Sequence, residues 1–391
     1  MTRRIAILGS TGSIGRQTLE VVDQSGDALQ VVALAAGGNW SLLFEQVKKY
    51  RPAVVAMMDP IAAEQLQAAL QAASIMVEVH TGQDGLIAVA TAPTADMVVT
   101  AVSGAIGLMP TMAAINSGKT IALANKETLV AAGQLVMAAA KEKNVAILPV
   151  DSEHSAIYQC LQGQDCRDLR LILTASGGPF RDFSLEELVQ VSPEQALRHP
   201  NWAMGAKITI DSASLMNKAL EVIEAHWLFD VSFDAIEVLI HPQSVIHSMI
   251  ELRDGAVLAQ LGIPDMRLPI QYALSYPERW TASWPRLRFS DHPNLTFRAP
   301  DHERFPCLAL AIEAGRAGGT APVVMNAANE VAVHAFLAHQ IGFMDIPRIV
   351  RETIQAHAWQ ASPNLDGILA SDQWARENAA MRVAGGREFS G

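Results

Sequence analysis

Two carboxylates separated by a single residue, Asp151 and Glu153, are candidate ligands for a metal ion. They follow an apolar stretch, residues 146–150, that we expect to be a strand. Side chains two positions apart on an extended segment point to the same side, so both carboxylates would converge there. Carboxylate oxygens suit Mg²⁺ or Mn²⁺. The pair therefore predicts a divalent-metal site, with a solvated strand end as the alternative.

A second polar group interrupts an apolar helical pattern further along the chain. Asn217, Lys218 and Glu221 are three and four residues apart, so they share one face of the predicted helix. Glu221 would supply a third metal carboxylate beside donors for a phosphate, to which the hydroxyls of Ser176 and Ser212 would add. The alternative is a surface face with a Lys–Glu pair that contributes only a few tenths of a kcal/mol.

Glycines at three-residue spacing, Gly9, Gly12 and Gly15, follow the first apolar stretch. This spacing allows a tight turn and lets backbone N–H groups approach a pyrophosphate at a helix N-terminus. Hydroxyl side chains among the glycines are expected to reach phosphate oxygens: Ser10, Thr11 and Ser13. An ordinary Gly-rich turn is the alternative, but the position after a first strand favours nucleotide binding.

The segment after the second predicted strand bears on the choice between NADP and NAD. Enzymes that use NAD usually carry an acid there, which binds the ribose 2′-hydroxyl. This chain has Ala36, Gly37, Gly38 and Asn39 instead. No carboxylate of this segment would repel a 2′-phosphate, so the sequence favours NADP.

These residues require a framework of strands and helices to position them. Short apolar stretches alternate with helical patterns over residues 1–150, which predicts an α/β, Rossmann-like, doubly wound NADPH-binding domain. The expected strands are residues 5–8, 31–35, 54–58, 97–102, 120–124 and 146–150.

The rest of the chain predicts further parts. Residues 151–275 are expected to form an α+β domain with a mixed sheet, which carries the candidate metal and phosphate residues. Its expected elements are strands at 169–174, 236–240, 245–252 and 256–261 and a long helix at 215–228. Residues 276–306, rich in Pro, Trp and Arg, are interpreted as a linker, and residues 307–391 as a C-terminal α-helical bundle.

The composition excludes several classes of protein. Half of the 391 residues are hydrophobic and 18% are charged, which excludes global disorder. The net charge of −11 argues against non-specific binding of nucleic acid. We expect no membrane association, because no apolar run approaches the ~18 residues of a spanning helix. Cys160, Cys166 and Cys307 lack metal-type spacing and favour a cytoplasmic protein without disulfides.

Longer motifs occur in order from residue 5 to beyond residue 330. They are residues 9–15, 124–127, 149–154, 176–180, 199–202, 211–213, 216–218, 241–247, 262–267 and 326–330. Together they closely resemble the 1-deoxy-D-xylulose 5-phosphate reductoisomerase family of the non-mevalonate isoprenoid pathway. The resemblance implies a homodimeric oxidoreductase that uses NADPH and Mg²⁺ or Mn²⁺. It also implies that residues 151–275 form the catalytic, metal- and substrate-binding and dimerisation domain. Its substrate would be rearranged and then reduced to 2-C-methyl-D-erythritol 4-phosphate.

The resemblance also implies roles for individual residues. The metal would bind Asp151, Glu153 and Glu221, and the catalytic residues would be Lys126 and Glu153. The substrate would contact Ser152, Glu153, Ser176, His199, Ser212, Asn217, Lys218 and Glu221. The nucleotide would contact Thr11, Gly12, Ser13, Ile14, Gly37, Gly38, Asn39, Asn125, Lys126, Glu127 and Gly205.

The sequence differs from many relatives at Gly38, and it also predicts one mobile segment and two packing histidines. Many relatives carry Lys or Arg at the position of Gly38, where a cation can pair with the 2′-phosphate. We therefore expect NADPH to be preferred over NADH by a narrower margin than in those relatives. Residues 198–205 are expected to form a mobile lid over the substrate. His241 and His247 are expected to pack within the sheet or at a subunit interface rather than bind the metal.

Two other functions stay open at this point. An NADP-dependent dehydrogenase of the semialdehyde type shares the Gly-rich start, but it needs a nucleophilic cysteine. Cys160 and Cys166 flank a polar turn that has no catalytic character. A non-catalytic nucleotide-sensing protein would keep the fold and lose the site, against which the retained carboxylates and Lys218 argue.

Overall fold

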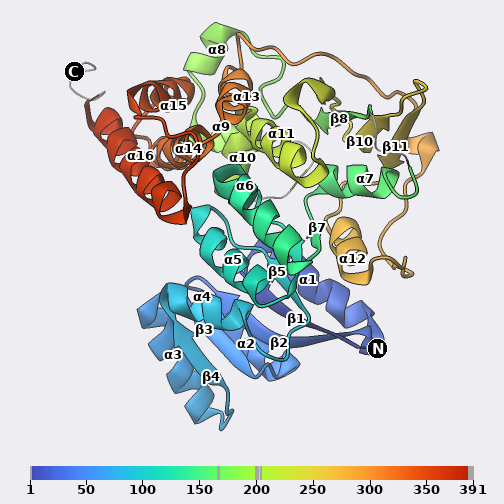
Figure 1. Cartoon of the computed structure of the whole chain (residues 1–391), viewed down its shortest axis with the longest axis vertical. Coiled ribbons are helices and arrows are strands. Elements are labelled where there is room, and N and C mark those ends of the chain that lie inside the picture. The colour runs from blue at the N-terminus through green and yellow to red at the C-terminus, as the bar shows by residue number, and fades with distance from the viewer. Residues whose placement is uncertain (1, 165–167, 199–201, 203–204, 386–391) are drawn as a thin grey trace. The chain divides into compact units, whose positions relative to one another are not determined.

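The computed structural model describes residues 2–164, 168–198, 202 and 205–385 (Figure 1). The chain forms two compact units. Unit 1 comprises Met1–Thr128, Val136–Ser155 and Asp265–Trp284, and unit 2 comprises Leu129–Leu135, Ala156–Pro264 and Pro285–Gly391. Both units are assembled from discontinuous segments. The sequence-based division into residues 1–150, 151–275, 276–306 and 307–391 therefore rests on a different criterion and stays a prediction.

Unit 1 is built on a parallel sheet with the strand order β4-β3-β2-β1-β5-β6-β7. The strands are β1 Arg3–Leu8, β2 Leu29–Ala36, β3 Val54–Met57, β4 Glu78–Thr81, β5 Met97–Thr100, β6 Thr120–Leu123 and β7 Ile147–Pro149. The associated helices are α1 Ser13–Gln24, α2 Trp40–Tyr50, α3 Pro60–Ala72, α4 Gly82–Ala90, α5 Leu108–Asn116, α6 Lys126–Lys143 and α12 Arg267–Ser275. β5 is buried along its whole length, as expected for a strand covered on both faces. The Rossmann-like fold is confirmed.

The strand order reverses between β1 and β5, which are neighbours in the sheet. In open α/β sheets, ligands bind outside the carboxyl ends of the strands at such a switch point. The Gly-rich loop follows β1 at this edge. The two loops approach closely, because a Cβ built on Gly9 would lie 2.4 Å from the Ala101 carbonyl oxygen after β5. The topology thus places the predicted nucleotide loop where the fold binds ligands.

β4 was not among the strands expected from the sequence. It lies at the edge of the sheet, and its residues are exposed or half-buried. Glu78 and His80 interrupt its apolar pattern and pair with each other at 2.9 Å. An edge strand that is solvated in this way has little of the apolar signal on which sequence-based recognition of a strand depends.

Unit 2 contains a second, mixed sheet with the order β11-β10-β8-β9. β8 is parallel to β9, whereas β10 is antiparallel to both of its neighbours. The strands are β8 Arg170–Ala175, β9 Ile236–Ile240, β10 Ile246–Glu251 and β11 Val257–Leu261. The turn expected before β11 is present, with Gly255 at φ 83°. The expected mixed sheet is confirmed.

Helices complete unit 2, including a group at the C-terminal end of the chain. They are α7 Ser152–Cys160, which spans the boundary between the units, α8 Leu185–Val189, α9 Pro193–Ala196, α10 Ala206–Ala213, α11 Met216–Phe229, α13 Cys307–Ala317, α14 Ala321–Leu337, α15 Asp345–Ala356 and α16 Leu365–Gly385. α14 is buried along most of its length and contributes to the core of this unit. Within the described residues, no helix combines the length and apolarity needed to cross a membrane.

Candidate active site

The Gly-rich loop after β1 has the conformation that a pyrophosphate site needs. Gly9 adopts φ 85°, and a Cβ on Gly15 would lie 2.2 Å from the Gly9 carbonyl oxygen, so neither position tolerates a side chain. Helix α1 begins at Ser13, and its N-cap residue Gly12 provides no side-chain cap. The first N–H groups of α1 are therefore not occupied by a capping side chain, and they can bind an anion.

One of the three hydroxyls expected to reach a phosphate has another role. Ser10 is fully buried, and its Oγ donates to Gln46 Oε1 at 2.7 Å. The Gln46 amide in turn donates to the Ser10 carbonyl oxygen at 2.9 Å. Ser10 thus fastens the loop to α2, and the expectation that its hydroxyl is available to phosphate is wrong. Thr11 and Ser13 are half-buried and stay candidates.

The segment between β2 and α2 is exposed at Gly37, Gly38 and Asn39. Asn39 is the N-cap of α2, and its Oδ1 accepts a hydrogen bond from the Leu42 N–H at 3.1 Å. This cap explains locally why the helix begins there. Gly37 has open space where a side chain would stand.

Asn125, Lys126 and Glu127 form the start of α6. Asn125 is fully buried and caps α6, while its amide donates to the carbonyl oxygens of Val102 at 2.8 Å and Gly104 at 3.0 Å. The same amide donates to Glu127 Oε2 at 3.2 Å. Asn125 therefore ties the loop after β5 to the helix that carries Lys126 and Glu127, a structural role that the sequence did not indicate.

Asp151 and Glu153 lie close together, as the sequence predicted, but by a different local geometry. β7 ends at Pro149, and α7 begins at Ser152, so Glu153 is in the first turn of a helix and not on an extended segment. Asp151 and Glu153 still have carboxylate oxygens within 4.8 Å of each other. Both side chains are partly buried, and the Ser152 hydroxyl donates to Glu153 Oε2 at 2.5 Å.

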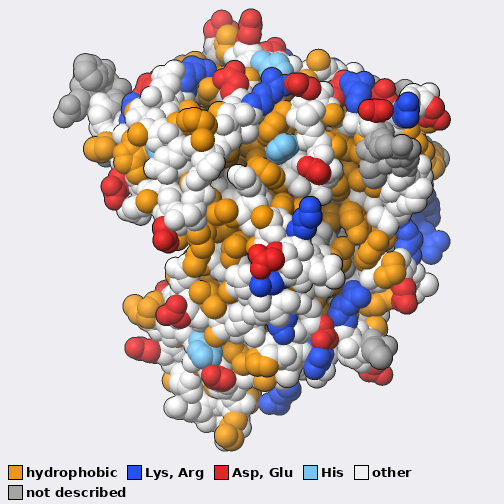
Figure 2. All heavy atoms as spheres, in the orientation of Figure 1, with side chains coloured by type: hydrophobic (Ala, Val, Ile, Leu, Met, Phe, Trp, Pro, Cys, Tyr) orange, Lys and Arg blue, Asp and Glu red, His pale blue; other side chains and the backbone are white. Residues whose placement is uncertain are grey.

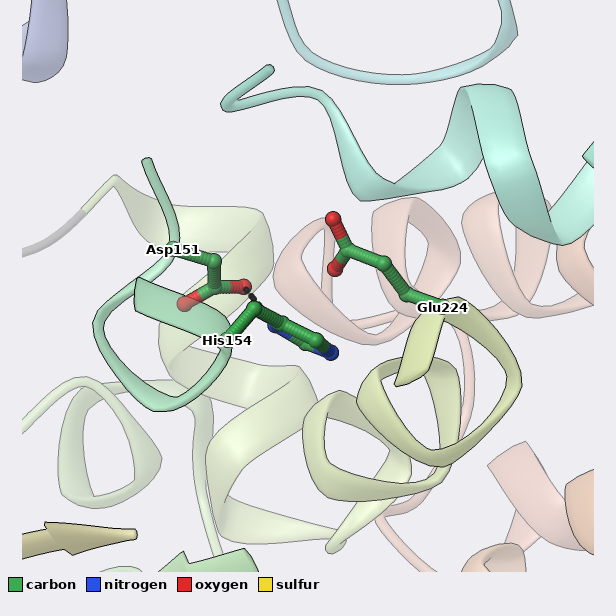
Figure 3. Close-up of side chains that lie close together, drawn as sticks. All are labelled: Asp151, His154 and Glu224. Atoms are coloured by element: carbon green, nitrogen blue, oxygen red, sulfur yellow. Dashed lines mark ion pairs between the residues drawn. The ribbon is translucent and has the colours of Figure 1, made fainter. Parts of the chain in front are cut away.

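A lysine and a histidine lie beside Asp151. Lys126, which is 5% exposed, forms an ion pair with Asp151 Oδ2. His154 is fully buried, and its Nδ1 lies 4.0 Å from the same oxygen (Figure 3). His154 was not predicted as a site residue, although its place three positions after Asp151 was a signal for contact once α7 was recognised as a helix.

The polar face of α11 is buried, so the surface alternative considered for it is wrong. Lys218 and Glu221 are 3% and 1% exposed and form an ion pair. The Asn217 amide donates to Glu221 Oε1 at 2.6 Å. A buried carboxylate needs such donors, because removing its charge from water is costly. Glu224, also drawn in Figure 3, is a further buried carboxylate one turn along α11.

The two serines expected at a phosphate are brought together within unit 2. Ser176 follows β8, and its Oγ accepts from the Gly178 N–H at 3.2 Å. Gly178 has φ 68°, and a Cβ there would lie 2.8 Å from the Ser212 carbonyl oxygen. Only glycine fits this approach, which packs the Ser176 loop against the end of α10 that carries Ser212.

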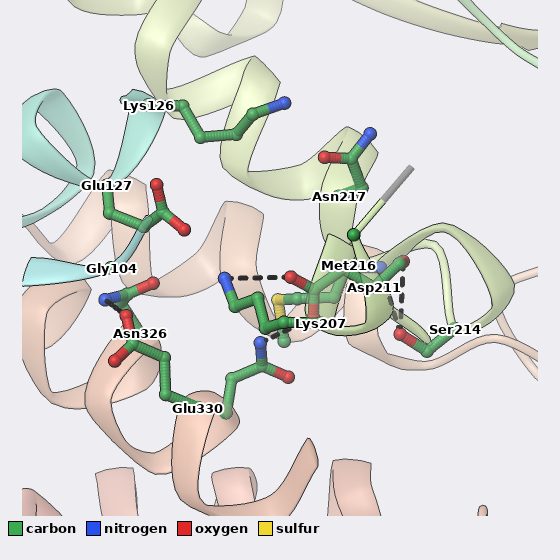
Figure 4. Close-up of polar contacts among 12 residues, drawn as sticks. Gly104, Lys126, Glu127, Lys207, Asp211, Ser214, Met216, Asn217, Asn326 and Glu330 are labelled. Carbon is green, nitrogen blue, oxygen red and sulfur yellow. Dashed lines mark hydrogen bonds and ion pairs between the residues drawn. The ribbon is translucent and has the colours of Figure 1, made fainter. Parts of the chain in front are cut away.

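Asp211 beside Ser212 anchors α10 to the C-terminal helices (Figure 4). Its carboxylate is 1% exposed, pairs with Lys207 at 2.9 Å and accepts from the Asn329 amide of α14 at 2.8 Å. One turn before Asn329, the Asn326 amide donates to Glu330 Oε1 at 3.0 Å. The motif at residues 326–330 thus has a structural explanation that its sequence alone did not provide.

The histidines of β10 and of the turn before it have the packing role expected. His241 is fully buried, and its Nε2 accepts from the N–H groups of Val245 and Ile246 at 3.2 Å. Its Nδ1 must then donate to the Thr296 carbonyl oxygen at 2.9 Å, which defines a neutral ring. Burial lowers the pKa of His241 and lowers that of His247 to about 4.

The residues predicted around the mobile lid are only partly covered by the structure. His199 and most of the expected lid lie outside the described residues. Gly205 is the exposed N-cap residue of α10. The Trp202 ring centroid lies 6.2 Å from that of His247, so Trp202 is placed beside β10.

Comparison with known proteins adds independent findings. The family model for 1-deoxy-D-xylulose 5-phosphate reductoisomerase matches residues 5–133, and two models for C-terminal domains of that enzyme match residues 147–229 and 261–378. The reductoisomerase of Heliobacterium modesticaldum is 69% identical over 390 residues, covering 100% of both chains. That of Desulforamulus reducens is 61% identical, over 97% of this chain and 98% of the relative.

Solved structures agree with these relatives. The Zymomonas mobilis reductoisomerase in complex with NADPH has a TM-score of 0.90 at 46% identity, covering 98% of this chain and 99% of that chain. A reductoisomerase in complex with NADPH, fosmidomycin and magnesium has a TM-score of 0.92 at 41% identity, covering 98% of each chain.

Proposed function

The chain belongs to the 1-deoxy-D-xylulose 5-phosphate reductoisomerase family, and we propose that Asp151, Glu153 and Glu221 hold the divalent metal of its reaction. The reaction is the NADPH-dependent isomerisation and reduction of 1-deoxy-D-xylulose 5-phosphate to 2-C-methyl-D-erythritol 4-phosphate. The observation that carries the metal proposal is the proximity of the Asp151 and Glu153 carboxylates at the start of α7. Their all-oxygen donor set fits Mg²⁺.

When bound, the metal supplies a Lewis acid for substrate oxygens, and NADPH supplies the hydride. Lys126 and Glu153 are the proposed catalytic residues. The Lys126 ammonium is nearly excluded from water beside Asp151, so it can hold positive charge close to the reacting diol. Ser152, through its hydrogen bond to Glu153, would orient that carboxylate and contact the same end of the substrate.

The other end of the substrate carries a phosphate. We assign it to Ser176, Ser212, Asn217 and Lys218, with His199 from outside the described residues. The Gly178 approach supports the pairing of the two serines, and burial of Lys218 supports a fixed cation. Charge-assisted hydrogen bonds of this kind are stronger than neutral ones and fix the orientation of a phosphate.

The nucleotide is assigned to the two loops at the carboxyl ends of β1 and β2 and to residues near α6 and α10. The proposed contacts are Thr11, Gly12, Ser13, Ile14, Gly37, Gly38, Asn39, Asn125, Lys126, Glu127 and Gly205. The uncapped start of α1 supports the pyrophosphate position.

Removing single carboxylates tests the metal proposal. Asp151→Asn, Glu153→Gln and Glu221→Gln should each lower kcat/KM at least about a hundredfold, since a lost charge-stabilising group costs about 3 kcal/mol of transition-state stabilisation. Binding of NADPH should stay near that of the wild type. The unfolding transition should be lowered in Asp151→Asn and Glu221→Gln, because each leaves a buried lysine without its ionised partner, and should stay near that of the wild type in Glu153→Gln. Glu186→Gln, which changes an exposed carboxylate of α8, is the matched control. Near-normal turnover at low Mg²⁺ in one variant would remove that residue from the ligand set.

A homodimer and a cytoplasmic location are also proposed, on the family resemblance and on the cysteine content of the chain. The mass of the purified protein in solution, measured by light scattering, tests the dimer directly. A monomeric mass at assay concentrations would contradict it.

The alternative dehydrogenase of the semialdehyde type finds no support among the described residues. It needs a reactive thiol, but burial raises the pKa of Cys307 to about 12. Cys160 is half-buried on α7, and Cys166 lies outside the described residues. A non-catalytic nucleotide sensor is disfavoured because the chain carries Lys218 and the three carboxylates and is 69% identical to a reductoisomerase.

A further inference from the structure

A carboxylate lies beside the segment 37–39 that follows β2, although that segment itself carries no acid. Asp59 follows β3 and caps α3, where its Oδ1 accepts from the N–H groups of Ile61 at 2.8 Å and Ala62 at 3.3 Å. These two hydrogen bonds hold the carboxylate in one orientation. The side chain is exposed, so its charge is available to a ligand.

Asp59 is tied to the segment after β2 by its backbone as well. Its N–H donates to the Gly37 carbonyl oxygen at 3.2 Å, and the preceding Met58 N–H donates to that of Ala36 at 2.8 Å. A Cβ built on Gly38 would find Asp59 Oδ2 at 3.8 Å as its nearest neighbour. Position 38 therefore lacks a cation and directly adjoins an anion.

We propose that Asp59 is a specificity-determining residue that weakens binding of NADPH relative to NADH. In NAD enzymes of this fold, an acid at the end of β2 binds the ribose 2′-hydroxyl and disfavours a 2′-phosphate. Here the carboxylate comes from the next strand in the sheet and faces the same loop. The proposal rests on the nucleotide site proposed above. The missing cation at Gly38 and the nearby carboxylate of Asp59 would both weaken binding of the 2′-phosphate.

The test compares the dissociation constants of NADPH and NADH for the full-length protein, measured by fluorescence titration without substrate. Asp59→Asn removes the charge and keeps a side-chain oxygen that can cap α3. The ratio of the NADH constant to the NADPH constant should rise about three- to tenfold, as expected for removal of one exposed charge near a phosphate. The rise should shrink at high salt, which a merely structural effect would not do.

Asp27→Asn is the matched control. Asp27 is an exposed acid in the turn before β2, at the opposite end of that strand from Gly38, so the net charge changes equally but far from the loop. The ratio of the NADH to the NADPH dissociation constant should be the same in Asp27→Asn as in the wild type. An unchanged ratio in Asp59→Asn, in a protein that binds NADPH, would overturn the proposal while leaving the proposed function intact. Failure of the wild type to bind either nucleotide would overturn the assigned nucleotide site and this proposal with it.

A second variant tests the same contact from the other side. Gly38 does not adopt a positive φ, and its nearest neighbour is at ordinary contact distance, so Gly38→Lys requires no backbone strain. The lysine ammonium introduced at position 38 would form an ion pair with Asp59. Asp59 would therefore compete with the 2′-phosphate for this cation. Gly38→Lys should therefore raise the preference for NADPH more in the Asp59→Asn background than alone. Equal effects in both backgrounds would contradict the contact.

Discussion

At the scale of single residues, the site pairs each carboxylate with a donor before any ligand arrives. Lys126 pairs with Asp151, and Lys218 pairs with Glu221. Both lysines are buried, so each carboxylate is stabilised by a cation in a region of low effective dielectric. Removing either lysine would leave its partner carboxylate without this compensating charge, so we expect a loss of stability in addition to any loss of activity.

The Gly-rich loop makes a prediction about backbone space. Gly15→Ala would place a Cβ 2.2 Å from the Gly9 carbonyl oxygen, so the loop or α1 must move. Such overpacking should cost about 1–3 kcal/mol of unfolding free energy and weaken NADPH binding about tenfold or more. Urea unfolding and fluorescence titration measure both. Gly385→Ala at the end of α16, where a Cβ meets no neighbour, should change neither; NADPH affinity equal to wild type in Gly15→Ala would contradict this account of the loop.

His247 makes a prediction about pH. Burial lowers its pKa to about 4, below its ordinary value of about 6.5, so the unfolded state binds more protons between these values. This contribution to stability is complete above about pH 6.5 and is lost as the pH falls towards 4, at up to about 1.4 kcal/mol per pH unit. Between about pH 7 and pH 5, the wild type should lose about 2 kcal/mol more unfolding free energy than His247→Gln. Parallel pH profiles of the two proteins would show that His247 is not the group responsible.

At the scale of elements, apolar patterns predicted the long strands and helices well. β9 has the bounds expected from its sequence, and α11, Met216–Phe229, lies within one residue of the expected helix at 215–228. The turn into α7 was misjudged, because Asp151 and Glu153 converge through a helical first turn that no apolar periodicity marks. α10 and α14 could not be linked from the sequence, because their contact joins residues 118 positions apart. The proximity of Asp151 and Glu153 was predictable from their spacing, but the buried network that holds α10 was not.

That network makes a prediction about element packing. Asn329→Leu removes the amide that donates to the buried Asp211 carboxylate. The chain should lose about 2–4 kcal/mol of unfolding free energy, because a buried charge loses a hydrogen-bond donor. Urea unfolding measures this, and Gln373→Leu, on an exposed position of α16, is the control that should stay near wild type. A loss as small as that of the control would show that Lys207 alone satisfies Asp211.

At the scale of the whole molecule, the chain carries a net charge of −11 yet acts on an anionic sugar phosphate. Acidic and basic side chains are interspersed on the face visible in Figure 2, without a uniformly basic surface there. Attraction of the substrate must therefore come from local groups, and the net charge alone does not identify them. The overall composition argues against non-specific binding of nucleic acid, and the position of the phosphate site stays a proposal.

The measurement that tests the central claim most directly is NADPH oxidation by the purified full-length protein after addition of 1-deoxy-D-xylulose 5-phosphate, with and without Mg²⁺. We predict that NADPH is consumed only when both substrate and metal are present, that 2-C-methyl-D-erythritol 4-phosphate accumulates in equal amount, and that chelation of the metal stops the reaction reversibly. A folded protein that binds NADPH but does not oxidise it under these conditions, or that oxidises it equally well after the metal is removed, would contradict the account.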